Sequence, residues 1–320
     1  MPSLNQAPLR PCLRCRLKSK ASPAFTLIEL LVSISIIGIL ASLLLPSLSR
    51  SKQKAQGIYC LNNGRQMMTA ITLYATDFHD LLMPNPDDAT RLTGHNWCSG
   101  VAGRNGPAEF NPDLLKDPTR SLLALYIERN VSVFHCPGDK RTGYYQGDDP
   151  AMKGMKISAV RTFSMNQAVG TICPGYSVGT KRINDAFPPH TGVPSVPVNG
   201  PWLNNNYSNL HDSPWATYGK LSNIGAPGPS KLWVLVDEDD SGLNDAAFAF
   251  GMVEAKWIDG PGTYHNGGCG FAFADGHSES HKWLDPAAKL GNRKVIVNEK
   301  DRLDWLWMRD RTSAYVGTQQ

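Results

Sequence analysis

An uncharged apolar run near the start of the chain is the feature that most constrains its fold. The twenty residues from Leu30 to Ser49 carry no charged side chain. As an α-helix rising about 1.5 Å per residue, such a run extends about 30 Å, the thickness of a bilayer's hydrocarbon core. A cleaved secretory signal has a shorter apolar core of about 7–15 residues followed by a small-x-small site, and no convincing site of this kind follows Leu45. The run therefore predicts a membrane-spanning helix.

Basic residues precede the run and bear on both orientation and partners. Residues 1–24 contain no acidic side chain and five basic ones, Arg10, Arg14, Arg16, Lys18 and Lys20. Because positive charge is retained on the cytoplasmic side, we expect a cytoplasmic N-terminus and export of everything after Arg50. The formal net charge of the chain is +4, and subtracting the five leader charges leaves −1. The rest of the chain therefore gives no indication of nucleic-acid binding.

The residues at the start of the run form a specific pattern. A basic leader and the small residue Ala24 are followed by Phe-Thr-Leu-Ile-Glu at 25–29 and then by the apolar run. This pattern resembles the N-terminus of type IV prepilins and type II secretion pseudopilins. The resemblance implies that the prepilin peptidase/methyltransferase cleaves between Ala24 and Phe25 and methylates the new amino group of Phe25. It also implies assembly with other pseudopilins or copies of the chain, on an inner-membrane secretion platform.

Glu29 is the only charged residue between Phe25 and Ser49. An isolated carboxylate at membrane depth costs several kcal/mol unless it is paired or neutralised. In an assembly, Glu29 could face the N-terminal amine of a neighbouring Phe25. The two groups would then form an ion pair inside a helix bundle of low dielectric constant. The alternative is that Glu29 lies near the cytoplasmic headgroups and stays hydrated, because only about one helical turn separates it from Phe25.

The helix is expected to extend beyond the membrane. Pro46 lacks a backbone donor and is predicted to kink or break it. After Pro46 an apolar stripe recurs at spacings of three and four and predicts a helix whose apolar face packs on a globular domain. The weak helix formers Gly57, Asn62, Asn63 and Gly64 predict local fraying. The residues of the stripe are Gly57, Cys60, Leu61, Gly64, Met67, Met68, Ile71, Tyr74, Ala75 and Phe78.

We predict an α+β fold in which this long N-terminal helix packs on a loop-rich, mainly antiparallel β domain, as in pilins. The expected organisation is a basic leader at 1–24, a transmembrane and assembly helix at 25–49, its soluble continuation at 50–80 and an exported head at 81–320. Within the head, a helix is predicted at 118–128 and strands at 131–136, 161–166 and 231–237.

A second motif lies near the other end of the chain. His265 is followed by nine residues and then by Asp275 and Gly276, which resembles the H-x9-DG motif of prepilin-type processing-associated proteins. Alternating apolar and polar residues predict a β-hairpin within 265–283, with Asp275 and Gly276 as a two-residue type I′ turn. The motif is therefore interpreted as structural, and His265 as a hydrogen-bonding residue that ties the preceding loop to the hairpin.

Two groups of side chains are candidate metal ligands. His277, Glu279 and His281 share one face of the second hairpin strand, and His265 and Asp275 could come near them to bind zinc. An ordinary solvent-exposed strand is the alternative.

The second group, Asp237, Asp239 and Ser241 before Gly242, imitates the start of a calcium loop. The twelfth loop position would be Phe248, which cannot ligate, so an EF-hand is excluded and an acidic solvated loop is the alternative.

The chain contains seven cysteines, of which Cys12 and Cys15 lie in the leader. Disulfides are permitted in the exported part. We predict a bridge between Cys60 and Cys136, because each lies at the edge of a predicted regular element.

These observations together predict a pseudopilin-like structural subunit that needs no cofactor and is not an enzyme. It would be a single-pass protein of the bacterial inner membrane, with a periplasmic or extracellular head. Two alternatives remain open at this point. One is an exported binding module that uses the prepilin helix only as an anchor, and the other is a metal-dependent enzyme.

Overall fold

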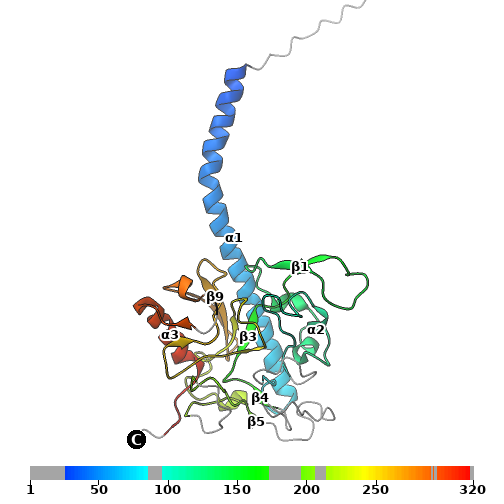
Figure 1. Ribbon diagram of the computed structural model, residues 1–320, viewed down its shortest axis with the longest axis vertical. Coiled ribbons are helices and arrows are strands. Elements are labelled where there is room, and N and C mark those ends of the chain that lie inside the picture. Colours follow the sequence, from blue (N-terminus) through cyan, green and yellow to red (C-terminus); the bar gives the residue numbers. More distant parts are fainter. Residues whose placement is uncertain are drawn as a thin grey trace, which may run out of the picture. The chain divides into compact units, whose positions relative to one another are not determined.

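The chain forms two compact units, Met1–Ser49 and Arg50–Gln320. The long helix α1 (Leu27–Asp77) contributes residues to both of them (Figure 1). The computed structural model describes residues 26–85, 96–172, 196–205, 214–289, 291 and 294–317. The predicted α+β class is confirmed, because a long N-terminal helix is followed by a domain of mainly antiparallel sheets.

The first unit presents the apolar part of α1. Its large apolar side chains are exposed, from 48% for Val32 to 85% for Leu27. The helix is long and apolar enough to cross a membrane. It also continues through Pro46, so this residue does not end it. A proline in a helix removes one hydrogen bond, and the surrounding turns keep theirs.

A five-stranded sheet forms the centre of the second unit, in the order β10-β9-β6-β3-β7. All neighbouring strands are antiparallel except β3 and β7. The strands predicted at 161–166 and 231–237 are confirmed as β3 and β6. The bounds are β3 Phe163–Asn166, β6 Trp233–Asp237, β7 Ala247–Phe248, β9 Gly268–Phe273 and β10 Ser278–Lys282.

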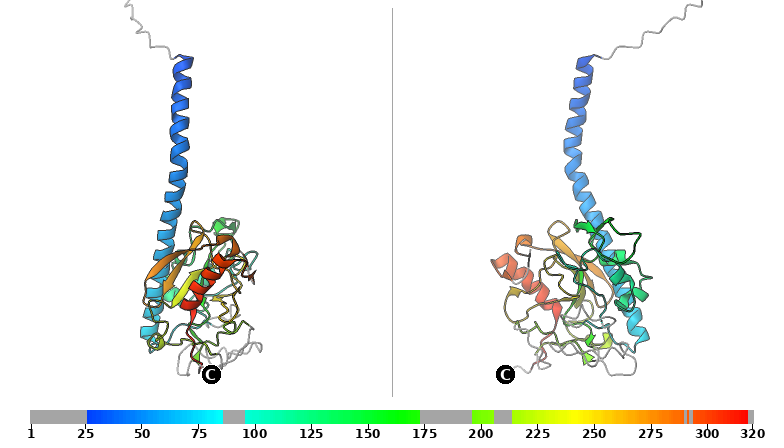
Figure 2. Two further views of the ribbon diagram at one scale, coloured as in Figure 1. Left: turned by 90° about the vertical axis from the view of Figure 1, so that its left-hand side faces the viewer. Right: turned by 45° about the vertical axis from the view of Figure 1, so that its right-hand side comes forward.

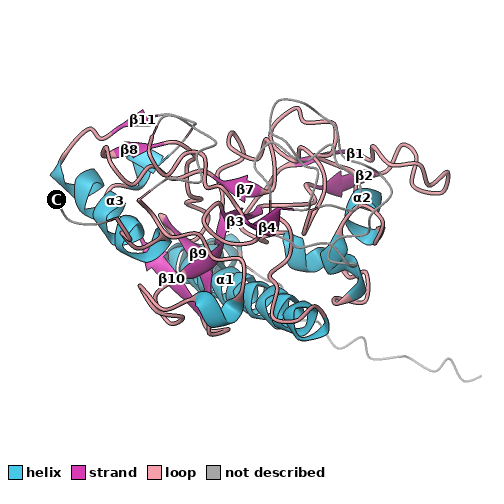
Figure 3. Cartoon of the chain, turned by 90° about the horizontal axis from the view of Figure 1, so that it is seen from below, coloured by secondary structure: helices cyan, strands magenta, loops and turns pink. Residues whose placement is uncertain are grey.

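The two faces of β9 differ in side-chain size, and each receives a different helix. Small residues such as Ala272 face α1, where a Cβ on Gly64 would lie 3.2 Å from that of Ala272. On the opposite face Phe271 packs edge-on against Trp307, with ring centroids 5.1 Å apart. Trp307 belongs to helix α3 (Glu299–Thr312), which lies on this side of the sheet (Figures 2 and 3). The alternation of aromatic and small residues in the sequence therefore serves two helix contacts.

Short elements surround this sheet. Helix α2 spans Asp113–Lys116, and the paired strands are β1 with β2, β4 with β5 and β8 with β11. Their bounds are β1 Thr142–Tyr144, β2 Lys156–Ser158, β4 Thr171–Ile172, β5 Val196–Pro197, β8 Lys256–Trp257 and β11 Lys294–Val295. Four 3-10 helices span Leu122–Leu125, Val131–Phe134, Leu221–Asn223 and Pro286–Lys289 within the described residues.

Two of the predicted elements are wrong. The helix expected over 118–128 is reduced to a 3-10 turn at Leu122–Leu125, and the strand expected over 131–136 is a 3-10 turn at Val131–Phe134. Ser121 is extended, with φ −128° and ψ 106°, so no helix runs from Pro118 through it. The Asn130 side chain then accepts a hydrogen bond from the Ser132 amide and starts the second turn.

The β9–β10 hairpin is confirmed, but its turn is not type I′. The Phe273 amide donates to His277 O and the Gly276 amide donates to Phe273 O, both at 2.9 Å. Only Gly276 has a positive φ, of 89°, among the turn residues Ala274, Asp275 and Gly276. The connection is therefore a three-residue loop, a type I turn followed by a glycine in the left-handed region.

The apolar stripe of α1 packs on the domain as predicted, but the predicted fraying of its weak helix formers is wrong. The helix is continuous over these residues. Asn63 is buried and donates to the carbonyls of Ser132 and His135 at 3.2 and 3.1 Å. A Cβ on Gly64 would lie 3.2 Å from both Ala272 Cβ and Ser278 Oγ, so the glycine lets α1 lie close to the hairpin. Tertiary contacts thus favour Asn63 and Gly64 at positions where helix propensity alone disfavours them.

A buried charge cluster joins the 3-10 helix Pro286–Lys289 to α3. Lys289 is fully buried, and its ammonium lies 2.7 Å from Asp301 Oδ1 and 3.0 Å from Asp304 Oδ2. Burial alone would raise the pKa of Asp304. The nearby His281 imidazole, the Leu284 and Asp285 amides and Lys289 together outweigh it and lower that pKa to about 2.

We expect part of the stability of the second unit to be lost as the pH falls from about 4 to about 2. A carboxyl whose pKa is lowered by folding stabilises the fold above its unfolded pKa and loses that effect as it is protonated in the fold. A change from 3.8 to about 2 for Asp304 corresponds to about 2 kcal/mol. Urea unfolding of the wild type and Asp304→Asn at pH 5, 3 and 2 measures this. The difference between them should shrink at low pH, and a constant difference would contradict the expectation.

Candidate functional site

The start of α1 contains a local hydrogen-bond arrangement around Glu29. Its carboxylate accepts hydrogen bonds from the Thr26 amide and hydroxyl, both at 2.8 Å, and the Glu29 amide donates to Thr26 Oγ1 at 3.2 Å. This reciprocal pattern is a capping box, which satisfies backbone donors at a helix start. Ala24 and Phe25 lie outside the described residues. Glu29 is exposed in the single chain.

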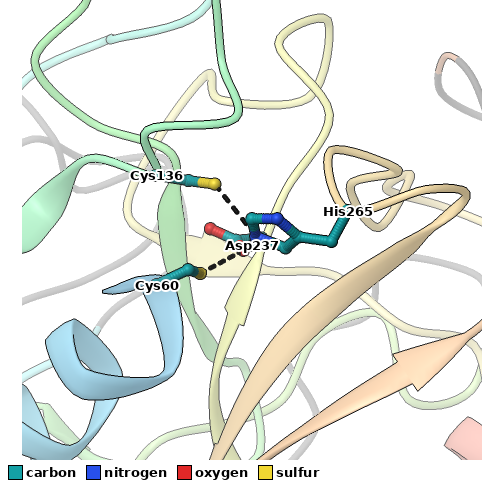
Figure 4. A group of neighbouring side chains, drawn as sticks. All are labelled: Cys60, Cys136, Asp237 and His265. Carbon is teal, nitrogen blue, oxygen red and sulfur yellow. Dashed lines mark hydrogen bonds and ion pairs between the residues drawn. The ribbon is translucent and has the colours of Figure 1, made fainter. Parts of the chain in front are cut away.

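A group of four potential metal ligands meets inside the second unit. Cys60 comes from α1, Cys136 follows the 3-10 turn at 131–134, Asp237 ends β6 and His265 lies in the loop before β9. Figure 4 shows the four side chains pointing toward one another. One ligand atom of each lies within 4.8 Å of those of the other three. Four segments distant in sequence thus contribute to one site.

The geometry of this group, which we call the Cys-His-Asp cluster, is tight. Cys60 Sγ donates to Asp237 Oδ2 at 2.7 Å. Cys136 Sγ lies 3.1 Å from His265 Nε2, which lies 3.6 Å from Asp237 Oδ2. The Cys60, Cys136 and Asp237 side chains are fully buried and that of His265 is 6% exposed.

Neighbouring backbone and hydroxyl groups hold the cluster in place. Thr162 Oγ1 donates to Asp237 Oδ1 at 3.0 Å and accepts from the Cys136 amide at 2.9 Å. The Gly138 amide donates to Cys136 Sγ at 3.3 Å. A Cβ on Gly270 would lie 3.0 Å from Cys60 Sγ, so a glycine there lets β9 approach the helix. The side chains are thus oriented from several elements.

The two thiols of the cluster have pKa values that are shifted in opposite directions. Burial raises the pKa of Cys60, and Cys136 and Asp237 raise it further. Burial also acts to raise the pKa of Cys136, but the hydrogen bonds from Cys60 and His265 outweigh it and lower that pKa. Burial disfavours the charged His265 imidazole, yet Asp237 and Cys136 raise its pKa to about 10. These pKa shifts favour the protonated form of Cys60 and the charged form of the His265 imidazole beside Cys136.

The disulfide predicted between Cys60 and Cys136 is not formed, since both are free thiols. They lie in one cluster, but Cys60 Sγ is directed to the Asp237 carboxylate and Cys136 Sγ to the His265 ring.

The predicted zinc ligands are not brought together. His277 contacts Asp275 through its ring nitrogen Nδ1 and stacks on Phe273. His281 stacks on Trp307 with ring centroids 3.7 Å apart. His265 alone of the predicted set reaches a cluster of potential ligands. His277 pairs with Asp275 at the hairpin loop and His281 packs on α3, so these side chains lie apart from His265.

The candidate calcium ligands also face different directions. Asp237 belongs to the Cys-His-Asp cluster. Asp239 Oδ1 accepts hydrogen bonds from the Ser241 amide at 3.1 Å and the Gly291 amide at 3.3 Å. Two residues two positions apart in one strand share a face of the sheet. Asp237 and Asp239 do not, because β6 ends at Asp237 and the chain turns after it.

A pocket of about 450 Å³ borders the cluster on the His265 side. Its wall includes Arg50, Lys54 and Gly57 of α1 together with His265 and Ser280. Cys60, Cys136 and Asp237 are not part of the wall, so the pocket reaches the cluster only through the imidazole.

Residues 20–45 match the family model described as the prokaryotic N-terminal methylation motif. This match supports a type IV pilin-like precursor that is cleaved and methylated by prepilin peptidase and assembles with other pilin-type subunits in a membrane system. The motif and the long apolar helix both fit membrane anchoring. No curated protein and no solved structure matches the chain.

The methylation motif carries a signal that sequence reasoning overlooked. Thr26 and Glu29 have the spacing of a capping box, Thr-x-x-Glu before an apolar run, which is readable without a structure. The H-x9-DG resemblance at the other end stays a prediction. The Cys-His-Asp cluster had a weaker signal, because Cys60 was assigned to the apolar stripe and no local spacing links it to His265.

Proposed function

We propose that the chain is a pseudopilin-like structural subunit, and not an enzyme, in a type II secretion or type IV pilus-like system. The observation that carries the proposal is the methylation motif followed by a helix whose large apolar side chains are exposed. Such a surface needs lipid before assembly and neighbouring helices after it. The basic leader supports a cytoplasmic N-terminus, and the head would lie in the periplasm or outside the cell.

Glu29 has a defined role in this proposal. Its carboxylate would pair with the methylated amine of Phe25 in a neighbouring subunit, where the ion pair replaces hydration lost in the helix bundle. The capping box offers a competing role, since it also depends on the Glu29 carboxylate. The two roles differ in chemistry. Capping needs hydrogen-bond acceptors, which glutamine also has, whereas pairing with the amine needs the charge.

Two matched variants separate these roles. Glu29→Gln keeps the capping acceptor and removes the charge, and Thr26→Ala weakens the cap and keeps the charge. We expect Glu29→Gln to lower assembly about tenfold or more, because a loss of about 1.4 kcal/mol of association free energy lowers the association constant tenfold. Thr26→Ala should assemble nearly as the wild type does. Assembly is measured in cells that contain the secretion system, by disulfide cross-linking between copies that carry Ile36→Cys or Leu40→Cys.

Mass spectrometry of the mature N-terminus provides the control. Methylated Phe25 in both variants would show that processing and membrane insertion are intact. An uncleaved leader in the wild type, or normal cross-linking of Glu29→Gln, would contradict the proposal.

A binding module anchored by the prepilin helix is the second candidate. The pocket beside His265 favours it, because Arg50 and Lys54 give its rim positive charge. An anchored receptor of this kind should stay monomeric, so Ile36→Cys and Leu40→Cys in the otherwise unchanged chain should give no cross-linked ladder.

A further inference from the structure

We propose that Cys60, Cys136, Asp237 and His265 bind one Zn²⁺ that fastens the soluble part of α1 to the central sheet. The inference does not rest on the proposed function, since it concerns the folding of the head.

The donor set fits zinc. Two cysteine sulfurs, one imidazole nitrogen and one carboxylate oxygen are ligands that Zn²⁺ binds with four-coordinate tetrahedral geometry. Bond lengths of about 2.0–2.3 Å imply separations of about 3.3–3.8 Å between ligand atoms. The contacts found are 2.7, 3.1 and 3.6 Å, and the group spans at most 4.8 Å. Small side-chain movements therefore suffice to place an ion between them.

The surroundings fit a metal as well. Metal ligands are commonly oriented by hydrogen bonds from outside the coordination sphere. Thr162 provides this for Asp237, and the Gly138 amide for the Cys136 sulfur. All four positions of a tetrahedron would be filled by protein and the cluster is buried, so the ion would be structural and not catalytic.

Binding of one Zn²⁺ releases two protons, so the net charge of the cluster does not change. Zn²⁺ takes the place of the proton that Cys60 donates to Asp237 and of the proton shared by Cys136 and His265, and both protons leave to solvent. The pocket beside His265 provides an approach from outside. The four ligands come from positions 60 to 265, so a bound ion would stabilise contacts that close long stretches of chain.

The test measures metal in the full-length protein purified in detergent. We expect elemental analysis to find one zinc per chain. After removal by a chelator, the protein should take up one Zn²⁺ and unfold at a higher temperature. Co²⁺ in its place should give thiolate charge-transfer and tetrahedral d–d absorption bands. These measurements use the wild type and do not depend on whether a variant folds.

Three variants locate the ion. Cys136→Ser should lose the zinc, whereas Cys98→Ser, the same change at another buried free cysteine, should keep it. His277→Ala should also keep it, which excludes the ligand set predicted from sequence. The proposal would be overturned by an apo protein that takes up no Zn²⁺, by unchanged zinc in a folded Cys136→Ser variant, or by a mass two hydrogens lower that shows a Cys60–Cys136 disulfide.

Discussion

Replacing Lys289 with methionine should destabilise the second unit by about 3–5 kcal/mol, because it leaves two buried carboxylates without their cation. Asp301 and Asp304 are each 1% exposed and both contact the Lys289 ammonium. The ammonium also lies 4.9 Å from the Trp257 ring centroid and 5.5 Å from that of Trp283. Methionine keeps the apolar contacts with these rings but supplies no charge. Urea unfolding of the full-length protein in detergent, followed by tryptophan fluorescence, measures the change.

The matched control is the same substitution at Lys282, an exposed residue of β10. Lys282→Met should change the stability by about 0.5 kcal/mol or less. The double variant Lys289→Met, Asp301→Asn should recover part of the loss, since one uncompensated charge is removed. If the two lysine variants were equally stable, the buried ion pairs would not contribute as described.

Gly268→Ala should destabilise the hairpin by about 3 kcal/mol, through overlap with backbone atoms. A Cβ at this first residue of β9 would lie 2.2 Å from the His281 carbonyl oxygen and 2.9 Å from Lys282 Cα. These atoms belong to the backbone of β10 and cannot rotate away, so the strands must separate at this end. Gly268 O also accepts a hydrogen bond from the His265 amide at 3.0 Å, which couples the strain to the Cys-His-Asp cluster.

Gly276→Ala distinguishes overlap from backbone conformation. Gly276 has a φ of 89°, but no atom lies within 4 Å of the position that its Cβ would occupy. The cost is therefore that of an alanine in the left-handed region, about 1–2 kcal/mol. Thermal unfolding of both variants should rank Gly268→Ala as the less stable, and the reverse order would contradict the steric argument.

Periodic patterns in the sequence predicted the long elements well. The uncharged run and the stripe from Cys60 to Ala75 follow helical spacing, and the stripe is the face that packs on the head. Strands β6 and β9 were also predictable, because apolar residues bounded by turn residues mark them. The errors lie where one residue decides the local structure. The extended backbone of Ser121 interrupts a predicted helix, and the positive φ of Gly276 makes the hairpin loop one residue longer.

The sequence by itself determined the long apolar helix of the first unit, the methylation motif and the order of the main elements, because these depend on neighbours along the chain. Only the tertiary structure decided which side chains form a site. It brought His265 together with Cys60, Cys136 and Asp237 and took His277 and His281 elsewhere. The reason is physical: helix and strand periods set which face a residue occupies, whereas the packing of α1 on the sheet decides which faces meet.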